Sequence, residues 1–265
     1  MMNETKNEDL FYQRLSELAD RCVTRYCPEF SHFLDGRSLF LANEYLKRSK
    51  ENDIRVVTFG GFNDAERRVV GVFPRDIYPE ETVPDDELCS MFELSAIEIS
   101  GSGFSSFSHR DVMGSVLGLG MKREAIGDIY VADDKMHAYI CLTDVAAGFL
   151  CESLEFVARD KVKVRKIDVS ELPAPERRFT VISGTVASER LDCIIALATN
   201  LSREKAKQLV VSGLVSVNHL EETRCDINLC EMDILSVRGY GRFKLHELGG
   251  VTRKGRNRVV IHKMI

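Results

Sequence analysis

Two short amphipathic segments between residues 189 and 218 constrain the fold of this chain more than any other feature of its sequence. The first segment carries apolar residues at the i, i+3, i+4 and i+7 positions of one helical face, namely Leu191, Ile194, Ile195 and Ala198. A second helix is expected to begin after Ser202, which can cap its N-terminus, and to end at Gly213. An apolar strand at 214–217 follows at once. The stretch therefore predicts two tightly joined helices that lead into a sheet.

The second of these helices carries two cations on one side. Arg203 and Lys207 are four residues apart, so they share a helical face, and it is not the face expected to be buried. A helix N-terminus with free N–H groups and two cations beside it is a phosphate-binding surface. Such a pair is also typical of a solvated helix face, and Arg190 with Asp192 can equally form an ion pair or a cap that supports the first helix.

Charge is distributed unevenly along the chain. The formal net charge of the whole is −5, yet residues 176–265 hold 15 Lys and Arg against 10 Asp and Glu. The first 175 residues hold 21 Lys and Arg against 31 Asp and Glu. One basic part attached to acidic parts is typical of a protein that contacts a polyanion through a single module.

Residues 1–80 predict a helix-rich N-terminal α/β domain. A first helix is followed by a second after the Asp35-Gly36 turn, and the β-rich runs 54–59 and 69–73 are expected to form a hairpin around GGFNDAERR. The stretch YPEETVPDDE at 78–87 is rich in proline and acidic residues, so we expect a linker there.

Residues 88–171 predict a middle α+β sandwich of the RRM-like or ferredoxin-like kind. We expect a hairpin around Gly101-Ser102-Gly103, a helix capped by Ser108, a hairpin around Asp133-Asp134, a helix capped by Thr143 and a closing strand within KVKVRKIDV. That order suits a mainly antiparallel sheet with two helices on one face. With LPAPE at 172–176 as a second linker, the chain is expected to be an α+β protein of three domains, the third at 176–265.

The cysteines do not predict a metal site. No two of the eight have the two-residue gap of a zinc knuckle, and the wider pairs, Cys22 with Cys27 and Cys225 with Cys230, lack a histidine at ligand spacing. Reduced cysteines that serve as small apolar residues are the favoured interpretation. The sequence has no apolar run of membrane-spanning length and begins with polar and acidic residues, so we expect a cytoplasmic protein.

The segment ERLDCIIALATNLSREKAKQLVVSGLVSVN resembles the S4 domain (αL type) of ribosomal proteins, pseudouridine synthases and tyrosyl-tRNA synthetases, and the likeness continues through SVRGYGRFKL at 236–245. In that family the two helices and the following strand form a surface that follows the backbone of structured RNA. The resemblance implies RNA contact by Arg190, Ser202, Arg203, Lys205, Lys207, Asn218, Arg238, Arg242 and Lys244, with Arg203 and Lys207 at the centre. His219 departs from the pattern because glycine is frequent there, which affects only the shape of the turn.

A basic segment near the end of the chain adds further candidates. TRKGRNR at 252–258 is flanked by β-rich runs, so a hairpin is expected. Its turn is either an ordinary basic turn or a second phosphate contact, made by Arg253, Lys254 and Arg256.

Nearly the whole chain resembles the YlmH family. The matching pieces are FLDGRSLFLA at 33–42, FGGFNDAERR at 59–68, SHRDVMGSVLGLGMKREAIGDIYV at 108–131 and VRGYGRFKL at 237–245, although Gly36 stands where proline is common. The resemblance implies three domains and a role in ribosome-associated quality control. Its partners would be ribosomal RNA and tRNA on the large ribosomal subunit, including peptidyl-tRNA. A link to cell division has also been made for the family.

The middle domain offers a candidate second RNA surface, formed by His109, Arg110, Lys122 and Arg123. The alternative is that the nearby glycines permit close helix packing and that these cations are merely solvated. Aromatic residues occur in this region, among them Phe92, Phe104, Phe107 and Tyr139, but no aromatic-glycine run of the RNP type is present. Base stacking on this sheet is therefore not predicted.

The sequence leaves two classes of function open. The favoured hypothesis is a non-catalytic RNA-binding factor that needs no cofactor, metal or small-molecule substrate. The alternative is an RNA-modifying enzyme, or its accessory subunit, in which the S4-like part delivers RNA to an active site in residues 1–170. Arg190-Leu191-Asp192 is similar to a catalytic run of pseudouridine synthases, but here it opens the S4-like helix, so no catalytic residue is predicted. A deep pocket lined by paired polar residues in the first two domains would favour the enzyme.

Overall fold

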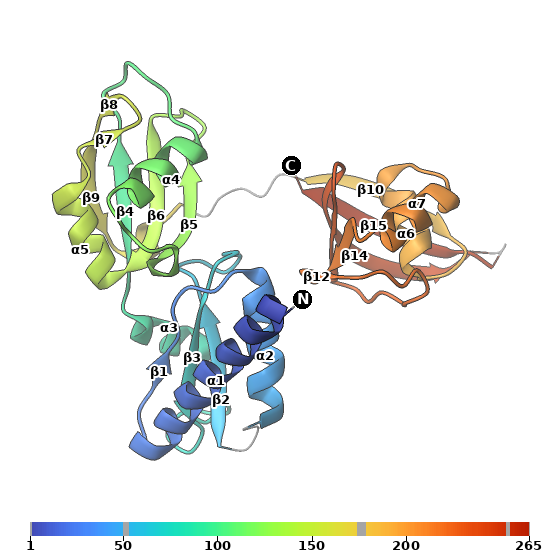
Figure 1. The fold of residues 1–265 in the computed structure, drawn as a ribbon, viewed down its shortest axis with the longest axis horizontal. Helices are drawn as coiled ribbons and strands as arrows, with labels where there is room; N and C mark the ends of the chain where they lie inside the picture. The colour runs from blue at the N-terminus through green and yellow to red at the C-terminus, as the bar shows by residue number, and fades with distance from the viewer. Residues whose placement is uncertain (1, 50–52, 174–178, 253–254, 265) are drawn as a thin grey trace. The chain divides into compact units, whose positions relative to one another are not determined.

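The computed structural model describes residues 2–49, 53–173, 179–252 and 255–264 (Figure 1). The chain divides into two compact units, residues 1–175 and 176–265. In the described ranges no helix has both the length and the apolar character needed to cross a bilayer. The mixed α+β class is confirmed, and the three-domain division stays a prediction.

The N-terminal part of the first unit is a small antiparallel sheet covered by two helices. Its elements are α1 (Met2–Arg25), β1 (Glu29–Phe30), α2 (Gly36–Ser49), β2 (Ile54–Phe59) and β3 (Val69–Pro74), with strand order β1-β3-β2. Leu18 of α1 and Leu46 of α2 pack on Val70 and Val72 of β3 in one core. Asp35 accepts a hydrogen bond from the backbone N–H of Ser38 (2.9 Å), so it caps α2 as the turn signal indicated.

The proline-rich stretch 78–87 differs from the expected linker because it packs on this sheet. Arg55 of β2 is a buried charge, only 4% exposed. Its guanidinium donates to the carbonyl oxygens of Tyr78 (3.3 Å), Pro79 (3.4 Å) and Val83 (2.6 Å), and it pairs with the carboxylate of Asp85. One arginine thereby holds the stretch in place, and the chain continues into α3 (Asp85–Cys89) and η1 (Ser90–Phe92).

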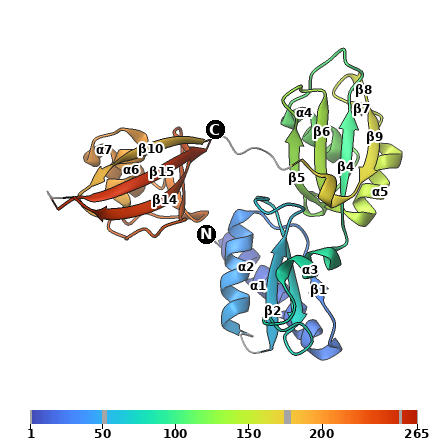
Figure 2. The ribbon, with the colours of Figure 1, turned by 180° about the vertical axis from the view of Figure 1, so that it is seen from behind.

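The remainder of the first unit is the predicted antiparallel sandwich (Figures 1 and 2). Its main elements follow in the order β4 (Leu94–Ser100), α4 (His109–Gly118), η2 (Arg123–Ala125), β5 (Ile126–Val131), β6 (His137–Thr143), α5 (Asp144–Ser153) and β9 (Lys163–Ile167). The strand order β5-β6-β4-β9 and the βαββαβ succession are those of a ferredoxin-like fold. Val116 of α4 and Leu150 of α5 pack on Ile97 and Ile140 of the sheet, so both helices cover one face.

The hairpin expected around Gly101-Ser102-Gly103 is wrong. β4 pairs with β6 and β9, whereas residues 101–107 form a loop. The carboxylate of Asp160 fixes that loop by accepting hydrogen bonds from the backbone N–H (3.0 Å) and the hydroxyl of Ser102. Asp160 lies in a small hairpin, β7 (Phe156–Val157) with β8 (Asp160–Lys161), that the sequence pattern did not indicate. Ser108 caps α4 as expected and forms a capping box with Asp111.

Two parts of the first unit are joined through exposed and partly buried hydrogen bonds. The carboxylate of Asp128 on β5 accepts from the backbone N–H groups of Glu66 (2.6 Å) and Arg67 (3.0 Å). The Arg67 guanidinium donates to the carbonyl oxygens of Ile126 (2.8 Å), Phe33 (3.2 Å) and Arg123 (3.0 Å). The GGFNDAERR loop therefore docks on the sandwich, which explains why residues 1–175 form one compact unit.

The second unit is a six-stranded antiparallel sheet with two helices on one face (Figure 1). Its elements are β10 (Phe179–Val186), α6 (Leu191–Thr199), α7 (Arg203–Val211), β11 (Val215–Val217), β12 (Leu220–Glu221), β13 (Ile234–Val237), β14 (Gly241–Val251) and β15 (Asn257–Met264), with strand order β10-β15-β14-β13-β11-β12. The predicted stripe of α6 and the residues Ala206 and Val210 of α7 pack on Leu235, Phe243 and Ile261. The β14–β15 hairpin around TRKGRNR is confirmed, but Arg253 and Lys254 lie outside the described residues.

Candidate nucleic-acid interface

A buried carboxylate brings two of the predicted RNA-contacting cations together. Nε of Arg203 donates to Oδ2 of Asp192 (2.8 Å), and Nε of Arg190 donates to Oδ1 of the same residue (3.3 Å). The Asp192 side chain is 0% exposed, whereas those of Arg190 and Arg203 are 36% and 49% exposed. The carboxylate therefore lies beneath the surface and holds two guanidinium groups at it.

The two arginines also determine the charge state of Asp192. Burial alone would raise the pKa of this carboxyl, but the hydrogen bond and charge of Arg203, together with Arg190, outweigh burial and lower the pKa. The hydrogen bond to Asp192 in turn raises the pKa of Arg203. The cluster of one carboxylate and two guanidinium groups keeps a net positive charge at neutral pH.

The N-terminus of α7 lies at this cluster. Ser202 has extended backbone angles, and its hydroxyl accepts from the backbone N–H of Lys205 (3.4 Å), as the predicted cap requires. Lys207 lies one turn after Arg203 on the same side of α7 and has no ion-pair partner within the described part of the chain. Lys205 is exposed but is rotated about 200° from Arg203 around the helix axis, so it points to the other flank.

Two predicted cations lie on the opposite face of the sheet. Phe243 and Leu245 of β14 are buried against α6 and α7, so the alternating residues Arg242 and Lys244 point to the outer face. The structure therefore does not place Arg242 around Arg203 and Lys207 as the sequence interpretation had it. Contact between RNA and these two outer residues stays a prediction.

The side chain of Asn218, which the sequence pattern suggested as an RNA contact, stabilises a turn in the structure. Its amide nitrogen donates to Oδ1 of Asp233 (2.8 Å), and its amide oxygen accepts from the backbone N–H of Ile234 (2.9 Å). With φ values of 48° and 69°, Asn218 and His219 form the two-residue turn between β11 and β12. His219 thus adopts the left-handed conformation for which glycine is favoured, and the turn keeps its shape.

The remaining predicted residues of this unit are spread over its surface. Arg238 is exposed in the β13–β14 turn, where its backbone N–H donates to the carbonyl of Leu214 (2.9 Å), just beyond the C-terminal end of α7. Arg256 is exposed as well, and its guanidinium donates to the hydroxyl (3.0 Å) and the carbonyl (2.6 Å) of Thr185. Of the predicted set, the structure brings Arg190, Ser202, Arg203 and Lys207 together, and these four residues are called the α6–α7 surface below.

The second predicted surface, on the sandwich, is partly assembled. His109 and Arg110 are exposed in the first turn of α4, and Lys122 and Arg123 are exposed just before β5. The Arg123 guanidinium contacts the sulfur of Met113 (2.6 Å), one helical turn beyond His109. Arg123 therefore lies along α4, and Arg110, Lys122 and Arg123 occupy one region with His109.

Sequence reasoning missed an aromatic pair on the open face of the sandwich sheet. Tyr130 of β5 and Tyr139 of β6 are opposite each other in register, with ring centroids 6.3 Å apart and an interplanar angle of 21°. The Tyr139 hydroxyl donates to Glu98 (3.3 Å), which also pairs with Arg165 (2.9 Å). Strand alternation around the Asp133-Asp134 turn was the only signal that could have found this pair, because no RNP-type run marks it.

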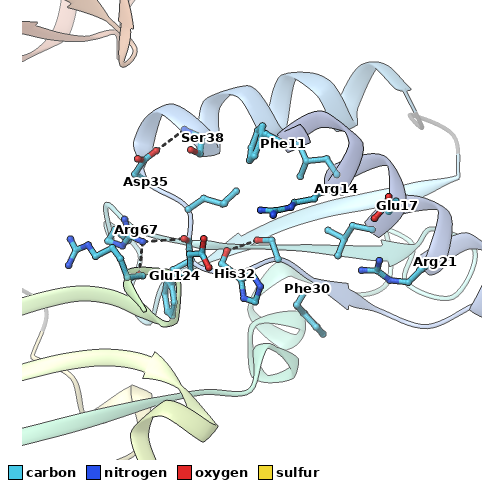
Figure 3. A pocket seen from close by; sticks show the side chains of 16 residues that line it. Phe11, Arg14, Glu17, Arg21, Phe30, His32, Asp35, Ser38, Arg67 and Glu124 are labelled. Atoms are coloured by element: carbon cyan, nitrogen blue, oxygen red, sulfur yellow. Dashed lines mark hydrogen bonds between the residues drawn. The ribbon is translucent and has the colours of Figure 1, made fainter. Parts of the chain in front are cut away.

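A cavity of about 450 Å³ lies in the first unit, beside α1 and the loop that leads to α2 (Figure 3). Its polar lining consists of Arg14, Glu17, Arg21, Ser31, His32, Asp35, Ser38, Arg67, Arg123 and Glu124. Arg67 bonds three backbone carbonyls, Glu17 accepts from Gln13 (3.0 Å), and Arg21 pairs with Glu29 (3.1 Å). These hydrogen bonds and this ion pair of the lining side chains stabilise the fold.

The described residues contain no group of three or more His, Cys, Asp or Glu side chains arranged to hold a metal ion. All eight cysteines are free thiols, and burial, with the nearby Asp128, raises the pKa of Cys141 to about 12.

Comparisons with known proteins converge on one family. A family model described as "Putative RNA-binding domain in YlmH" matches residues 89–171, which are the sandwich. The "Ribosome-associated protein quality control protein P2" of Bacillus subtilis (strain 168) is 30% identical over 259 residues, which is 97% of this chain and 96% of that protein. A solved structure, the cell division protein ylmH from Streptococcus pneumoniae, matches with a TM-score of 0.52 and 21% identity over 63% of this chain and 95% of that one. At that identity the last match is evidence for the fold alone.

Proposed function

This chain belongs to the YlmH family, and from that premise we propose that it is a non-catalytic RNA-binding protein that works on the ribosome in protein quality control. The observation that carries the proposal is the α6–α7 surface, where Asp192 holds two guanidinium groups beside Lys207 at a helix N-terminus. Such an arrangement suits phosphate groups of an RNA backbone. The Bacillus subtilis relative is named for ribosome-associated quality control, and it matches this chain over almost its full length. This match supports the choice of the ribosome.

Residues 176–265 are proposed to be an S4-type RNA-binding domain. Two short helices that pack on one face of an antiparallel sheet, followed by the Asn218–Asp233 contact, agree with the sequence likeness to that domain. The sandwich at 89–171 is proposed as a second RNA-binding module. It is supported by the description of the matching family model, by the cations near α4 and by the Tyr130–Tyr139 pair.

The finer proposal concerns the partner. We propose that the chain contacts ribosomal RNA and tRNA on the large subunit, including peptidyl-tRNA, as its family resemblance implies. Two RNA-binding modules on one chain would contact two RNA elements. A role on the ribosome would place the protein in the cytoplasm.

Neutralising the α6–α7 surface tests the proposal. In the variant Arg203→Ala, Lys207→Ala we expect weaker co-sedimentation with ribosomes at every salt concentration. Because each lost phosphate contact removes about one unit of the slope of log affinity against log salt, the slope should fall by about two. Fluorescence anisotropy with labelled ribosomal RNA fragments measures the same slope.

The matched control is Arg25→Ala, Arg48→Ala, which removes the same charge from α1 and α2 at side chains 65% and 82% exposed. It should bind like the wild type. Lys207→Ala alone should keep the stability of the wild type, since Lys207 is not part of the Asp192 cluster. A folded double variant that sediments with ribosomes at wild-type levels would show that the surface is misplaced.

A further inference from the structure

Three aromatic rings form a stack on the outer face of the C-terminal sheet. Phe179 of β10, His262 of β15 and His246 of β14 belong to three neighbouring strands. The rings of Phe179 and His262 have centroids 4.0 Å apart and an interplanar angle of 11°, and those of His262 and His246 are 4.0 Å apart at 18°. Nearly parallel rings at this spacing have the geometry in which planar aromatic groups and nucleobases stack.

Strand alternation places the stack opposite α6 and α7. Ile261 of β15 and Val186 of β10 are buried against the helices, so His262 and Phe179 point to the other face. No residue of the α6–α7 surface lies on this outer face. The stack is thus a separate feature of the same unit.

One end of the stack lies at the edge of the sheet, next to Phe179. β10 is an edge strand of the sheet, and Phe179 and its neighbour on the same face, Val181, are 48% and 53% exposed. The only ring found stacked on Phe179 among the described residues is that of His262. A further planar group can therefore extend the stack from the sheet edge.

The charge beside the stack is positive. Lys244 is directly opposite His262 in the β14–β15 register and has no ion-pair partner in the described ranges. Arg242 and Arg258 point to the same face, and among the described residues of β10, β14 and β15 the only acidic residue is Glu247. Burial, with the charges of His246 and Lys244, lowers the pKa of His262, so its ring is neutral at neutral pH.

We propose that this stack is a second RNA contact, on which an unpaired base stacks against Phe179 while Lys244 contacts a phosphate of the same strand. The inference rests on the proposed function, because it assigns a further contact to RNA already bound by the chain. Paired bases within a helix do not expose their faces, so the occupant is a nucleotide in a single-stranded segment next to the structured RNA. Aromatic rings beside positively charged side chains are the features by which proteins bind single strands.

Two RNAs test the inference with the full chain. One is a blunt stem-loop, and the other is the same stem-loop with a short single-stranded extension that carries 2-aminopurine, whose fluorescence is quenched on stacking. The wild type should bind the extended RNA more tightly, by roughly tenfold for one stacked base, and should quench the probe. Phe179→Ala, His262→Ala should lose both effects and bind the blunt stem-loop like the wild type.

Further variants distinguish the loss of the aromatic ring from a loss of stability. Phe179→Leu keeps an apolar side chain without the ring and should lose the quenching even if the double variant is unstable, whereas Phe179→Tyr should keep it. Phe104→Ala removes a phenylalanine that is 95% exposed in the first unit and serves as the matched control.

The outcomes are distinct. A wild type that binds neither RNA overturns the proposed function and this inference with it. Equal wild-type affinity for both RNAs, or quenching that persists in Phe179→Leu, overturns the stacking contact alone. Variants that keep RNA binding but no longer sediment with ribosomes would assign the stack to a protein partner instead.

Discussion

At the residue scale, Asp192 determines where two cations lie. Its carboxylate is fully buried and accepts from Arg190 and Arg203, so the ion pairs that support the fold also orient the candidate RNA contacts. The sequence left open whether Arg190 and Asp192 are structural or functional. The geometry shows that Asp192 is structural. The side chains of Arg190 and Arg203 are both partly exposed, so they can still contact a ligand.

Asp192→Asn tests this arrangement through its pH dependence. We expect a loss of about 1–3 kcal/mol in the free energy of unfolding, because the amide has no negative charge and keeps only one of the two acceptor oxygens, while both guanidinium groups remain partly solvated. The folded-state pKa of Asp192 is lowered below 3.8, so its contribution is present above that pH and is lost as the pH falls through the folded-state value. The difference between wild type and variant, measured by urea unfolding, should be constant near neutral pH and shrink below pH 3.8. A difference that grows on acidification would contradict the assignment.

At the element scale, a stretch that looks like a linker is part of the first unit because one buried arginine satisfies its carbonyl groups. Composition gave no sign of this, since prolines and acidic residues at 78–87 are typical of exposed loops. Arg55 lies on a strand that the sequence did predict, but its partners are 23 to 30 residues away.

Arg55→Ala should release this stretch. Three carbonyl groups lose a donor and a buried side chain is removed, so we expect a loss of about 2–4 kcal/mol in the free energy of unfolding and faster proteolysis between residues 78 and 84. Arg48→Ala is the control, because Arg48 is 82% exposed and its surface pair with Glu44 contributes little. Equal proteolysis of the two variants would mean that other contacts hold the stretch.

At the scale of the whole molecule, the basic part and the acidic part of the sequence coincide with the two compact units. The second unit has its own core, in which both helices and five strands take part. It therefore contains the apolar contacts that independent folding requires.

A fragment of residues 176–265 should fold alone. We expect one cooperative thermal transition, and RNA affinity that falls steeply with salt because its net charge is positive. Circular dichroism measures the thermal transition, and fluorescence anisotropy measures the RNA affinity at each salt concentration. The fragment 1–175 is the matched comparison and should show a shallower dependence on salt, since it carries an excess of acidic residues. A fragment 176–265 without a cooperative transition would place the domain boundary elsewhere.

The sequence alone determined the elements whose signals are local. The stripe of α6, the Ser202 and Ser108 caps and the β14–β15 hairpin follow from spacing and turn chemistry within a few residues, and all are confirmed. The expected strand after Gly103 is wrong, because Asp160, 58 residues away from Ser102, binds the loop and β9 takes the place beside β4. Such pairing depends on distant segments, which no local pattern contains.

For the candidate site, the sequence determined which residues carry charge, and only the tertiary structure decided which of them share a surface. Helical spacing predicts that Arg203 and Lys207 share a face. Arg190 lies beside them because the buried carboxylate of Asp192 binds both Arg190 and Arg203. Lys244 lies on the other face because the burial of Phe243 and Leu245 fixes the alternation of β14. The ring stack combines strands separated by many residues in sequence, so it exists only once the register of β10, β15 and β14 is set.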